Sequence, residues 1–199
     1  MKQVTDNVAE TENPAEKTPT LFTIGYSNRS LDSLLDLLHN YSIRQLIDVR
    51  SNPGSRDLYV FNRNSLSATL EEEAIAYAWL GPELGGLRRG KTQSPHQALA
   101  TNGFRAYADH MSSALFQDGI RRLMSVAGQT PTVILCAERE ACQCHRSLIA
   151  DYLLLNNWRI VHLLDINHTQ EHTLSPLVRS YNQQPIYDQL GQEQLDLSL

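Results

Sequence analysis

The sequence lacks any long apolar segment. No run approaches the roughly 20 apolar residues that cross a bilayer, and residues 1–20 hold no apolar core of the kind found in secretory signals. Cysteine is scarce as well: the chain has three, all between positions 136 and 144, which is a poor basis for a disulfide framework. These absences predict a protein of the reducing cytoplasm with no membrane partner.

Positive charge is not in excess either. The chain has 17 Lys and Arg residues against 22 Asp and Glu residues, so its formal net charge is −5. This balance argues against a generally cationic nucleic-acid binder, although a local basic patch on an acidic body is compatible with it. The hydrophobic fraction of 41% and the length of 199 residues are typical of one globular domain with a substantial core.

Apolar runs alternate with helical patterns along the chain. Strands are predicted at 21–25, 44–51, 75–80, 132–137 and 159–164, and helices at 30–41, 65–74, 104–115, 117–128 and 145–157. This alternation predicts an α/β fold: a single Rossmann-like three-layer domain with a mostly parallel sheet of about five strands. We expect a disordered leader at 1–20, the domain at 21–165, and a polar C-terminal extension at 166–199. The extension packs on the domain or trails from it, with one helix near 174–184.

The residues suited to chemistry follow the ends of four predicted strands. In open α/β sheets, ligands bind at the carboxyl ends of the strands. This rule selects the loops after Gly25, Val49, Leu80 and Leu135. The first loop brings Tyr26 and Asn28 to a helix N-terminus, which favours an anion such as phosphate; a simple capped turn is the alternative.

The second and third loops offer groups for an anionic ligand. Asp48 can orient a base or accept from a sugar hydroxyl, and the guanidinium groups of Arg50 and Arg56 can bind phosphate oxygens. An internal Asp–Arg ion pair that shapes the loop is the alternative. The third loop contains Gly86 and a basic cluster at 88–91, which could bind a polyanion or a phosphorylated small molecule. A solvated, mobile loop is the alternative.

The fourth loop lies in "VILCAEREACQCHRSL", residues 133–148. Cys136 ends a predicted strand, while Cys144, His145 and Arg146 stand at the start of a helix. A cysteine at a helix N-terminus beside cationic groups has more thiolate, which suits a nucleophile with Glu138 or His145 transferring protons. The alternative for Cys136 is a small buried residue with a structural role.

Other cysteine chemistries are weaker matches. Zinc binding is a further alternative, with candidate ligands in Cys136, Glu138, Cys142, Cys144 and His145. Structural zinc sites usually draw on two separate ligand pairs, so we predict no metal and no other cofactor. A disulfide between Cys136 and Cys144 is disfavoured in a reducing compartment. A protein-phosphatase loop needs arginine six positions after the cysteine, where this chain has Cys142 or Ala150.

A rhodanese-type sulfurtransferase stays open as a further alternative. Such enzymes share the strand-end cysteine and an upstream strand like "IDVR". The loop after Cys136, however, lacks the glycine and small residues that let amides surround a persulfide, and Glu138 and Glu140 would repel an anionic sulfur.

Six motifs occur in a specific order: "TIGYSNRSLDSLLDLL", "IDVRSNPGSR", "FNRNSL", "LGPELGG", "FRAYADHM" and "CAEREACQCHRSLIADYL". From about Leu21 to Leu163 the sequence resembles the bacterial and archaeal family called domain of unknown function 488. Tyr26 departs from it, because many relatives have histidine there. The resemblance implies a Rossmann-like fold and points to Asn28, Asp48, Arg50, Pro53, Ser55, Cys136, Glu138, Cys144, His145 and Arg146.

Together these features predict an enzyme acting on a small phosphorylated or nucleotide-like ligand. The expected catalytic residues are Asp48, Cys136, Glu138, Cys144 and His145, and the expected binding residues are Tyr26, Asn28, Arg50, Ser55, Arg56, Gly86 and Arg146. The rival hypothesis is a non-catalytic module that binds a ligand or nucleic acid through the same arginines. Neither hypothesis specifies a reaction or an oligomeric state.

Overall fold

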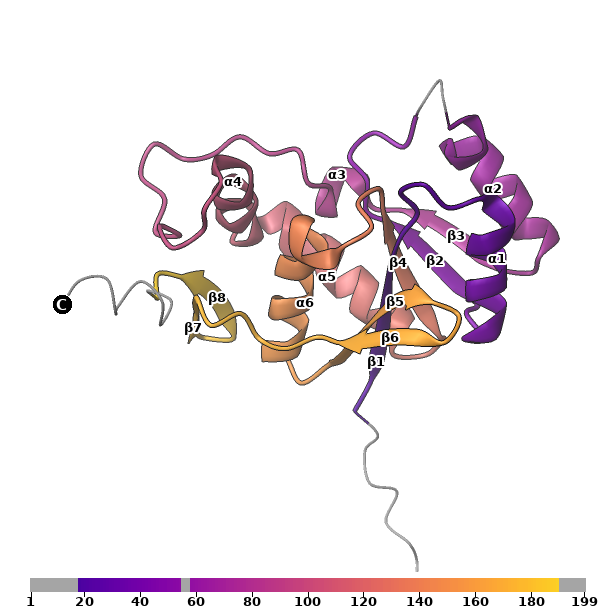
Figure 1. Cartoon of the computed structure of the whole chain (residues 1–199). Coiled ribbons are helices and arrows are strands. Elements are labelled where there is room, and N and C mark those ends of the chain that lie inside the picture. The colour runs from indigo at the N-terminus through magenta and orange to yellow at the C-terminus, as the bar shows by residue number, and fades with distance from the viewer. Residues whose placement is uncertain (1–17, 55–57, 190–199) are drawn as a thin grey trace, which may run out of the picture.

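The computed structural model describes residues 18–54 and 58–189. Its main sheet has six strands in the order β3–β2–β4–β1–β5–β6 (Figure 1). The strands are β1 (Thr20–Gly25), β2 (Gln45–Asp48), β3 (Ala76–Trp79), β4 (Thr132–Cys136), β5 (Arg159–Asp165) and β6 (His168–Glu171). Strands β1 to β5 are parallel to their neighbours, and β6 is antiparallel to β5. The predicted α/β fold with a mostly parallel sheet is confirmed.

Helices cover both faces of the sheet. Helices α1 (Leu31–Asn40) and α2 (Arg63–Glu72) lie on one face, and α4 (Asn102–Met111), α5 (Ala114–Ala127) and α6 (Arg146–Leu155) on the other. Side chains of the central strand β4 alternate between the two cores: Val133 and Leu135 pack with α1 and α2, whereas Ile134 and Cys136 pack with α4 to α6. This alternation places Cys136 on the same side of the sheet as α6.

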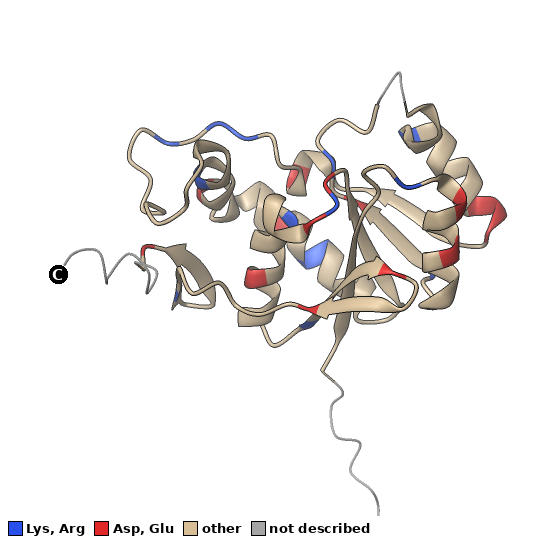
Figure 2. Ribbon diagram, in the orientation of Figure 1, with Lys and Arg blue, Asp and Glu red and all other residues tan. Residues whose placement is uncertain are grey.

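Short helical segments stand between the main elements: η1 (Tyr59–Phe61), α3 (Gly81–Leu84) and η2 (Ala141–Gln143). The segment after Leu80, predicted as one long loop, therefore begins with α3. The basic residues that follow α3 (Figure 2) are not all available to a ligand, because Arg88 donates to the carbonyls of Gly81, Pro82 and Gly85. None of the helices in the described ranges is long and apolar enough to span a membrane.

The C-terminal part differs from the prediction. The helix predicted near 174–184 is wrong, because β7 (Val178–Tyr181) and β8 (Gln184–Tyr187) form an antiparallel hairpin there. Asn182 and Gln183 have φ angles of 50° and 60°, the two positive values that a type I′ hairpin turn requires. The polar, exposed β6 makes a sixth strand where about five were predicted. β6 does not show the alternation of apolar and polar residues that predicts a strand, because it lies at the solvent-exposed edge of the sheet.

Both predicted terminal segments lie partly outside the described residues. Of the leader, residues 1–17 fall outside them, and its last residue, Thr20, begins β1. Of the extension, residues 190–199 fall outside them. The described part of the extension lies against α6, where the buried Tyr187 hydroxyl donates to Asp151 Oδ2 at 2.9 Å.

A buried chain of hydrogen bonds joins the sheet to this extension. The Nδ1 atom of His162 on β5 lies 2.7 Å from Thr23 Oγ1. Its Nε2 atom lies 3.1 Å from Nδ1 of His172. His172 Nε2 in turn lies 3.0 Å from Asp151 Oδ1. Burial, together with the nearby His172 and Arg146, lowers the pKa of His162 to about 4.

The pH dependence of stability should reflect this histidine. In the unfolded chain His162 takes up a proton near pH 6.5, whereas the folded chain resists protonation down to about pH 4. Its contribution is therefore complete above pH 6.5 and is lost as the pH falls toward 4. Between pH 7 and 4.5 we expect wild type to lose about 2.5 kcal/mol more unfolding free energy than His162→Gln.

Urea unfolding at the two pH values measures this difference. His168→Gln, at the exposed histidine that begins β6, is the matched control for the loss of one histidine side chain. Equal pH dependence in wild type and His162→Gln would contradict the prediction.

Candidate functional site

A cavity of about 490 Å³ opens at the carboxyl ends of β1, β2 and β4. All four predicted loops contribute to its wall: Tyr26 follows β1, Arg50 follows β2, Gly86 follows α3, and Cys136 ends β4. The parallel sheet explains this convergence, because it brings the carboxyl ends of neighbouring strands to one edge.

Most of the predicted site residues meet there. Seven of the twelve line the cavity: Tyr26, Arg50, Gly86, Cys136, Glu138, Cys144 and His145. Asp48 lies beneath it, and Arg146 is buried in the adjoining interior. Asn28 is exposed and is not part of the wall. Ser55 and Arg56 lie outside the described residues.

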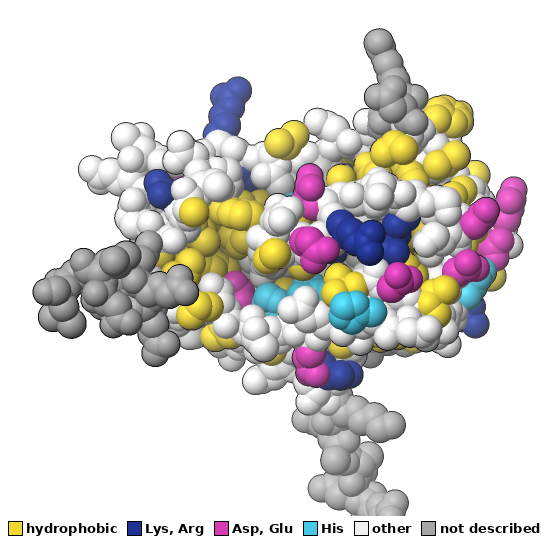
Figure 3. All heavy atoms as spheres, in the orientation of Figure 1, with side chains coloured by type: hydrophobic (Ala, Val, Ile, Leu, Met, Phe, Trp, Pro, Cys, Tyr) yellow, Lys and Arg dark blue, Asp and Glu magenta, His cyan; other side chains and the backbone are white. Residues whose placement is uncertain are grey.

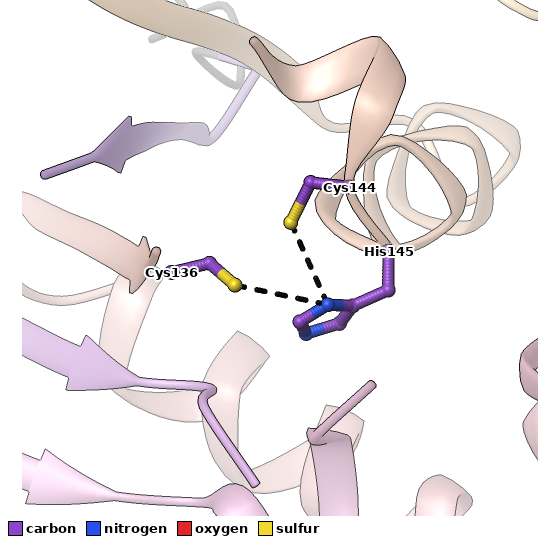
Figure 4. Close-up of side chains that lie close together, drawn as sticks. All are labelled: Cys136, Cys144 and His145. Atoms are coloured by element: carbon purple, nitrogen blue, oxygen red, sulfur yellow. Dashed lines mark hydrogen bonds between the residues drawn. The ribbon is translucent and has the colours of Figure 1, made fainter. Parts of the chain in front are cut away.

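Two thiols and an imidazole converge at the floor of the cavity (Figure 4). Cys136 comes from the end of β4, and the chain returns through η2 to Cys144 and to His145, the N-cap residue of α6. His145 Nδ1 lies 3.5 Å from Cys144 Sγ and 3.8 Å from Cys136 Sγ. All three residues are at least nine-tenths buried.

The other ring nitrogen determines the protonation of His145. Its Nε2 lies 3.1 Å from the backbone oxygen of Val49, and a carbonyl oxygen only accepts hydrogen bonds. The ring hydrogen is therefore on Nε2. Nδ1 in the neutral ring then carries the lone pair that faces the two sulfur atoms.

The two thiols share one hydrogen bond, which shifts their pKa values in opposite directions. The bond from Cys136 lowers the pKa of Cys144 well below its ordinary value, although burial opposes it. A hydrogen bond from a protonated His145 ring and the charge of Arg146 lower that pKa further. The bond to Cys144, together with burial, raises the pKa of Cys136. Cys144 is therefore the more acidic of the two thiols, and Cys136 donates the hydrogen bond that they share.

Arg50 is the cation of the cavity wall, and Asp48 holds it in place. Arg50 Nε lies 2.9 Å from Oδ1 and Nη2 2.5 Å from Oδ2 of Asp48. Asp48 Oδ2 also accepts from the Tyr77 hydroxyl at 2.7 Å. Burial alone would lower the pKa of Arg50, but the hydrogen bond and charge of Asp48 outweigh it and raise that pKa. The guanidinium is therefore charged at every ordinary pH.

An aromatic pair borders this arginine. The guanidinium carbon of Arg50 lies 5.1 Å from the centroid of the Tyr26 ring, and Tyr26 stacks on Phe61 of η1 with centroids 4.4 Å apart. The carboxylate below and the aromatic ring beside it leave the guanidinium little freedom, so its charge faces the cavity in one orientation.

The family described as domain of unknown function DUF488 matches residues 30–153, which is more than half of the chain. The protein belongs to the DUF488 family. Comparisons with curated proteins and with solved structures give no match. The matched segment contains Asp48, Arg50 and the whole cysteine–histidine cluster, while Tyr26 and Asn28 precede it.

Two of the predicted site residues in this DUF488 protein have buried protein partners. Asp48 is fully buried, does not line the cavity and accepts from the Arg50 guanidinium. Arg146 is 1% exposed and donates to the carbonyls of Glu138 and Arg139 and to Thr23 Oγ1. It therefore holds the loop after β4 through these bonds.

The glycines of the site allow close backbone contacts. A Cβ atom at Gly86 would lie 2.7 Å from His145 Nδ1, so only glycine lets this loop approach the imidazole. A Cβ atom at Gly25 would lie 1.8 Å from the backbone oxygen of Glu138. The first and fourth loops are therefore in direct backbone contact beside the cavity.

The sequence patterns did not single out several residues of the wall. Phe104 and Tyr107 on α4, and Gln143 in η2, line the cavity, and the Tyr107 ring lies 5.0 Å from that of His145. The sequence pattern predicted a helix over 104–115 and gave its aromatic residues no role in the site. No signal in that pattern distinguishes a core aromatic residue from one at the edge of a cavity.

Proposed function

We propose that this DUF488 protein is an enzyme that acts on a small phosphate-bearing, nucleotide-like molecule bound in the cavity. One observation carries the proposal: a fixed, permanently charged guanidinium and a cluster of two thiols and an imidazole line the same cavity. An anion-binding group beside reactive groups is the combination that positions a substrate for chemistry.

The cavity suits a small ligand in size and lining. Its volume of about 490 Å³ is within the usual range for small-molecule sites. Tyr26, Phe104 and Tyr107 supply aromatic surface for a base or sugar, and Arg50 supplies the partner for a phosphate. Glu138, an exposed residue of the wall, is placed to exchange protons with solvent.

The charge distribution favours a small ligand over a nucleic acid. On the face drawn in Figure 3, Lys and Arg side chains are interspersed with Asp and Glu and do not form a continuous basic surface. A nucleic-acid interface usually needs such a surface to neutralise several phosphates. The cytoplasmic location stays a prediction, with which three free cysteines agree.

Arg50→Lys tests the anion site. Lysine keeps a positive charge next to Asp48 but lacks the planar fork that binds two oxygens at once. Nucleoside mono- and diphosphates are screened by thermal shift, and the affinity of those that bind is measured by calorimetry. We expect Arg50→Lys to weaken this binding by about tenfold or more.

Arg121→Lys is the matched control, because Arg121 on α5 is two-thirds exposed and is not part of the cavity wall. It should bind as wild type does. The proposal fails if no phosphate-bearing probe binds, or if Arg50→Lys and wild type bind with the same affinity.

A further inference from the structure

The sulfur and nitrogen atoms at the floor of the cavity have the spacing of a metal-ligand set. Cys136 Sγ, Cys144 Sγ and His145 Nδ1 all lie within 4.8 Å of one another. Tetrahedral zinc, with bonds of about 2.3 Å to sulfur and about 2.0–2.1 Å to nitrogen, separates such atoms by about 3.5 Å. The observed Sγ–Nδ1 separations of 3.5 and 3.8 Å are close to this value.

The imidazole is oriented as a metal ligand requires. Histidines that bind a metal usually donate their second ring N–H to a carboxylate or a backbone carbonyl, which fixes the ring and its tautomer. His145 makes this bond to Val49 through Nε2. The lone pair of Nδ1 is consequently aimed at the space between the two sulfur atoms (Figure 4).

Charge also favours a cation between the sulfur atoms. Both cysteines bind a metal as thiolates, and two thiolates with one divalent ion have no net charge, which lowers the cost of burying them. The single shared hydrogen bond between the thiols would be replaced by two metal–sulfur bonds, and the thiol protons would pass to solvent.

The ligand set has an open side. Cys136, Cys144 and His145 all line the cavity together with Arg50 and Glu138. Structural zinc sites are closed by four protein ligands, whereas catalytic zinc sites have three and leave one position for water or substrate. Three ligands at the floor of an open cavity match the composition of a catalytic zinc site, which does not need two separate ligand pairs in the sequence.

We propose that Cys136, Cys144 and His145 bind one zinc ion whose fourth position faces the cavity. The three residues are then ligands, and the chemistry of the site belongs to water or a substrate oxygen on the metal. Metal binding depends only on these three side chains. Its role beside a phosphate-bearing substrate rests on the function proposed above.

Zinc uptake by the metal-free, reduced protein is the first test. Competition with a chromophoric chelator should show one zinc ion per chain. Cys136→Ser and Cys144→Ser each remove a ligand and should weaken binding by at least about 100-fold, more than the 10–100-fold typical of lost outer-shell partners. Cys142→Ser, at the exposed cysteine of the same loop, is the matched control and should bind as wild type does.

Two further measurements do not depend on whether the variants fold. Zinc should protect Cys136 and Cys144 of the wild-type protein from alkylation by iodoacetamide, while Cys142 stays reactive. Cobalt in place of zinc should give the strong near-ultraviolet bands of thiolate ligation. Its visible bands should shift when thiocyanate, a probe for the open position, is added.

The outcomes separate the two proposals. Failure to take up zinc, or an equal loss in Cys142→Ser and Cys144→Ser, overturns the metal site and leaves the anion site standing. Cobalt bands that thiocyanate does not change overturn the open position. Arg50→Lys protein should still take up one zinc ion. A loss of nucleotide binding in that variant therefore supports the anion site and does not bear on the metal site.

Discussion

Asp48→Ala is expected to lower the free energy of unfolding by about 3–5 kcal/mol, because it leaves a buried arginine without its counter-charge. Asp48 is fully buried, and Arg50 is 7% exposed. The carboxylate accepts from the Arg50 guanidinium, the Arg50 backbone N–H and the Tyr77 hydroxyl. Its removal therefore leaves several buried donors without an acceptor at once. Urea unfolding measures the loss.

Tyr77→Phe is the matched control for this change. It removes one hydrogen bond to the same carboxylate and leaves the ion pair intact, so we expect a loss of about 1.5–3 kcal/mol. The interpretation of Asp48 as the residue that positions Arg50 fails if Asp48→Ala costs no more than Tyr77→Phe. Nucleotide binding by folded Asp48→Ala protein should also weaken, because Arg50 loses its fixed orientation.

Gly25→Ala should cost about 3 kcal/mol, at the upper end of the usual range for overpacking. Its Cβ would lie 1.8 Å from the Glu138 backbone oxygen and 2.6 Å from the carbonyl carbon. Backbone atoms cannot rotate out of the way as a side chain can, so the loop after β4 must move. Cys136 begins this loop, so we also expect the reactivity of the buried thiols toward iodoacetamide to rise.

Gly54→Ala is the control for the general effect of adding a methyl group to a glycine. Apart from its chain neighbours, no described residue has an atom within 4 Å of the Cβ position there. The free energy of unfolding should therefore change by no more than about 0.5 kcal/mol. If Gly25→Ala is as mild as Gly54→Ala, and the thiols keep their wild-type reactivity, the close contact between the first and fourth loops is not needed.

The fold was predictable because its strands are nearly continuous apolar runs. All residues of β4 are buried, which is the pattern of a central parallel strand covered on both faces. The hairpin β7–β8 was not predictable in the same way. Its turn depends on Asn182 and Gln183 taking positive φ angles, and only asparagine of the two is a common turn signal.

Parts of the site followed from the sequence for a similar reason. A parallel sheet brings the loops after its strands to one edge, so Arg50, Cys136 and His145 could be expected at one place before any distance was known. Their separate roles did not follow. Asp48 and Arg146 carry the charges expected of functional groups. Both are buried, however, and form hydrogen bonds with neighbouring protein atoms.

From the sequence alone follow the α/β fold, the family resemblance and the four loops, because each depends on residue types in a local pattern. The distances among Cys136, Cys144 and His145 depend on how β4, η2 and α6 pack, and so does the Val49 carbonyl that orients the imidazole. A pattern records which side chains are present but not where their atoms meet. For this reason the sequence indicated a nucleophile with its base, whereas the folded chain brings two thiols and an imidazole together at the floor of a cavity.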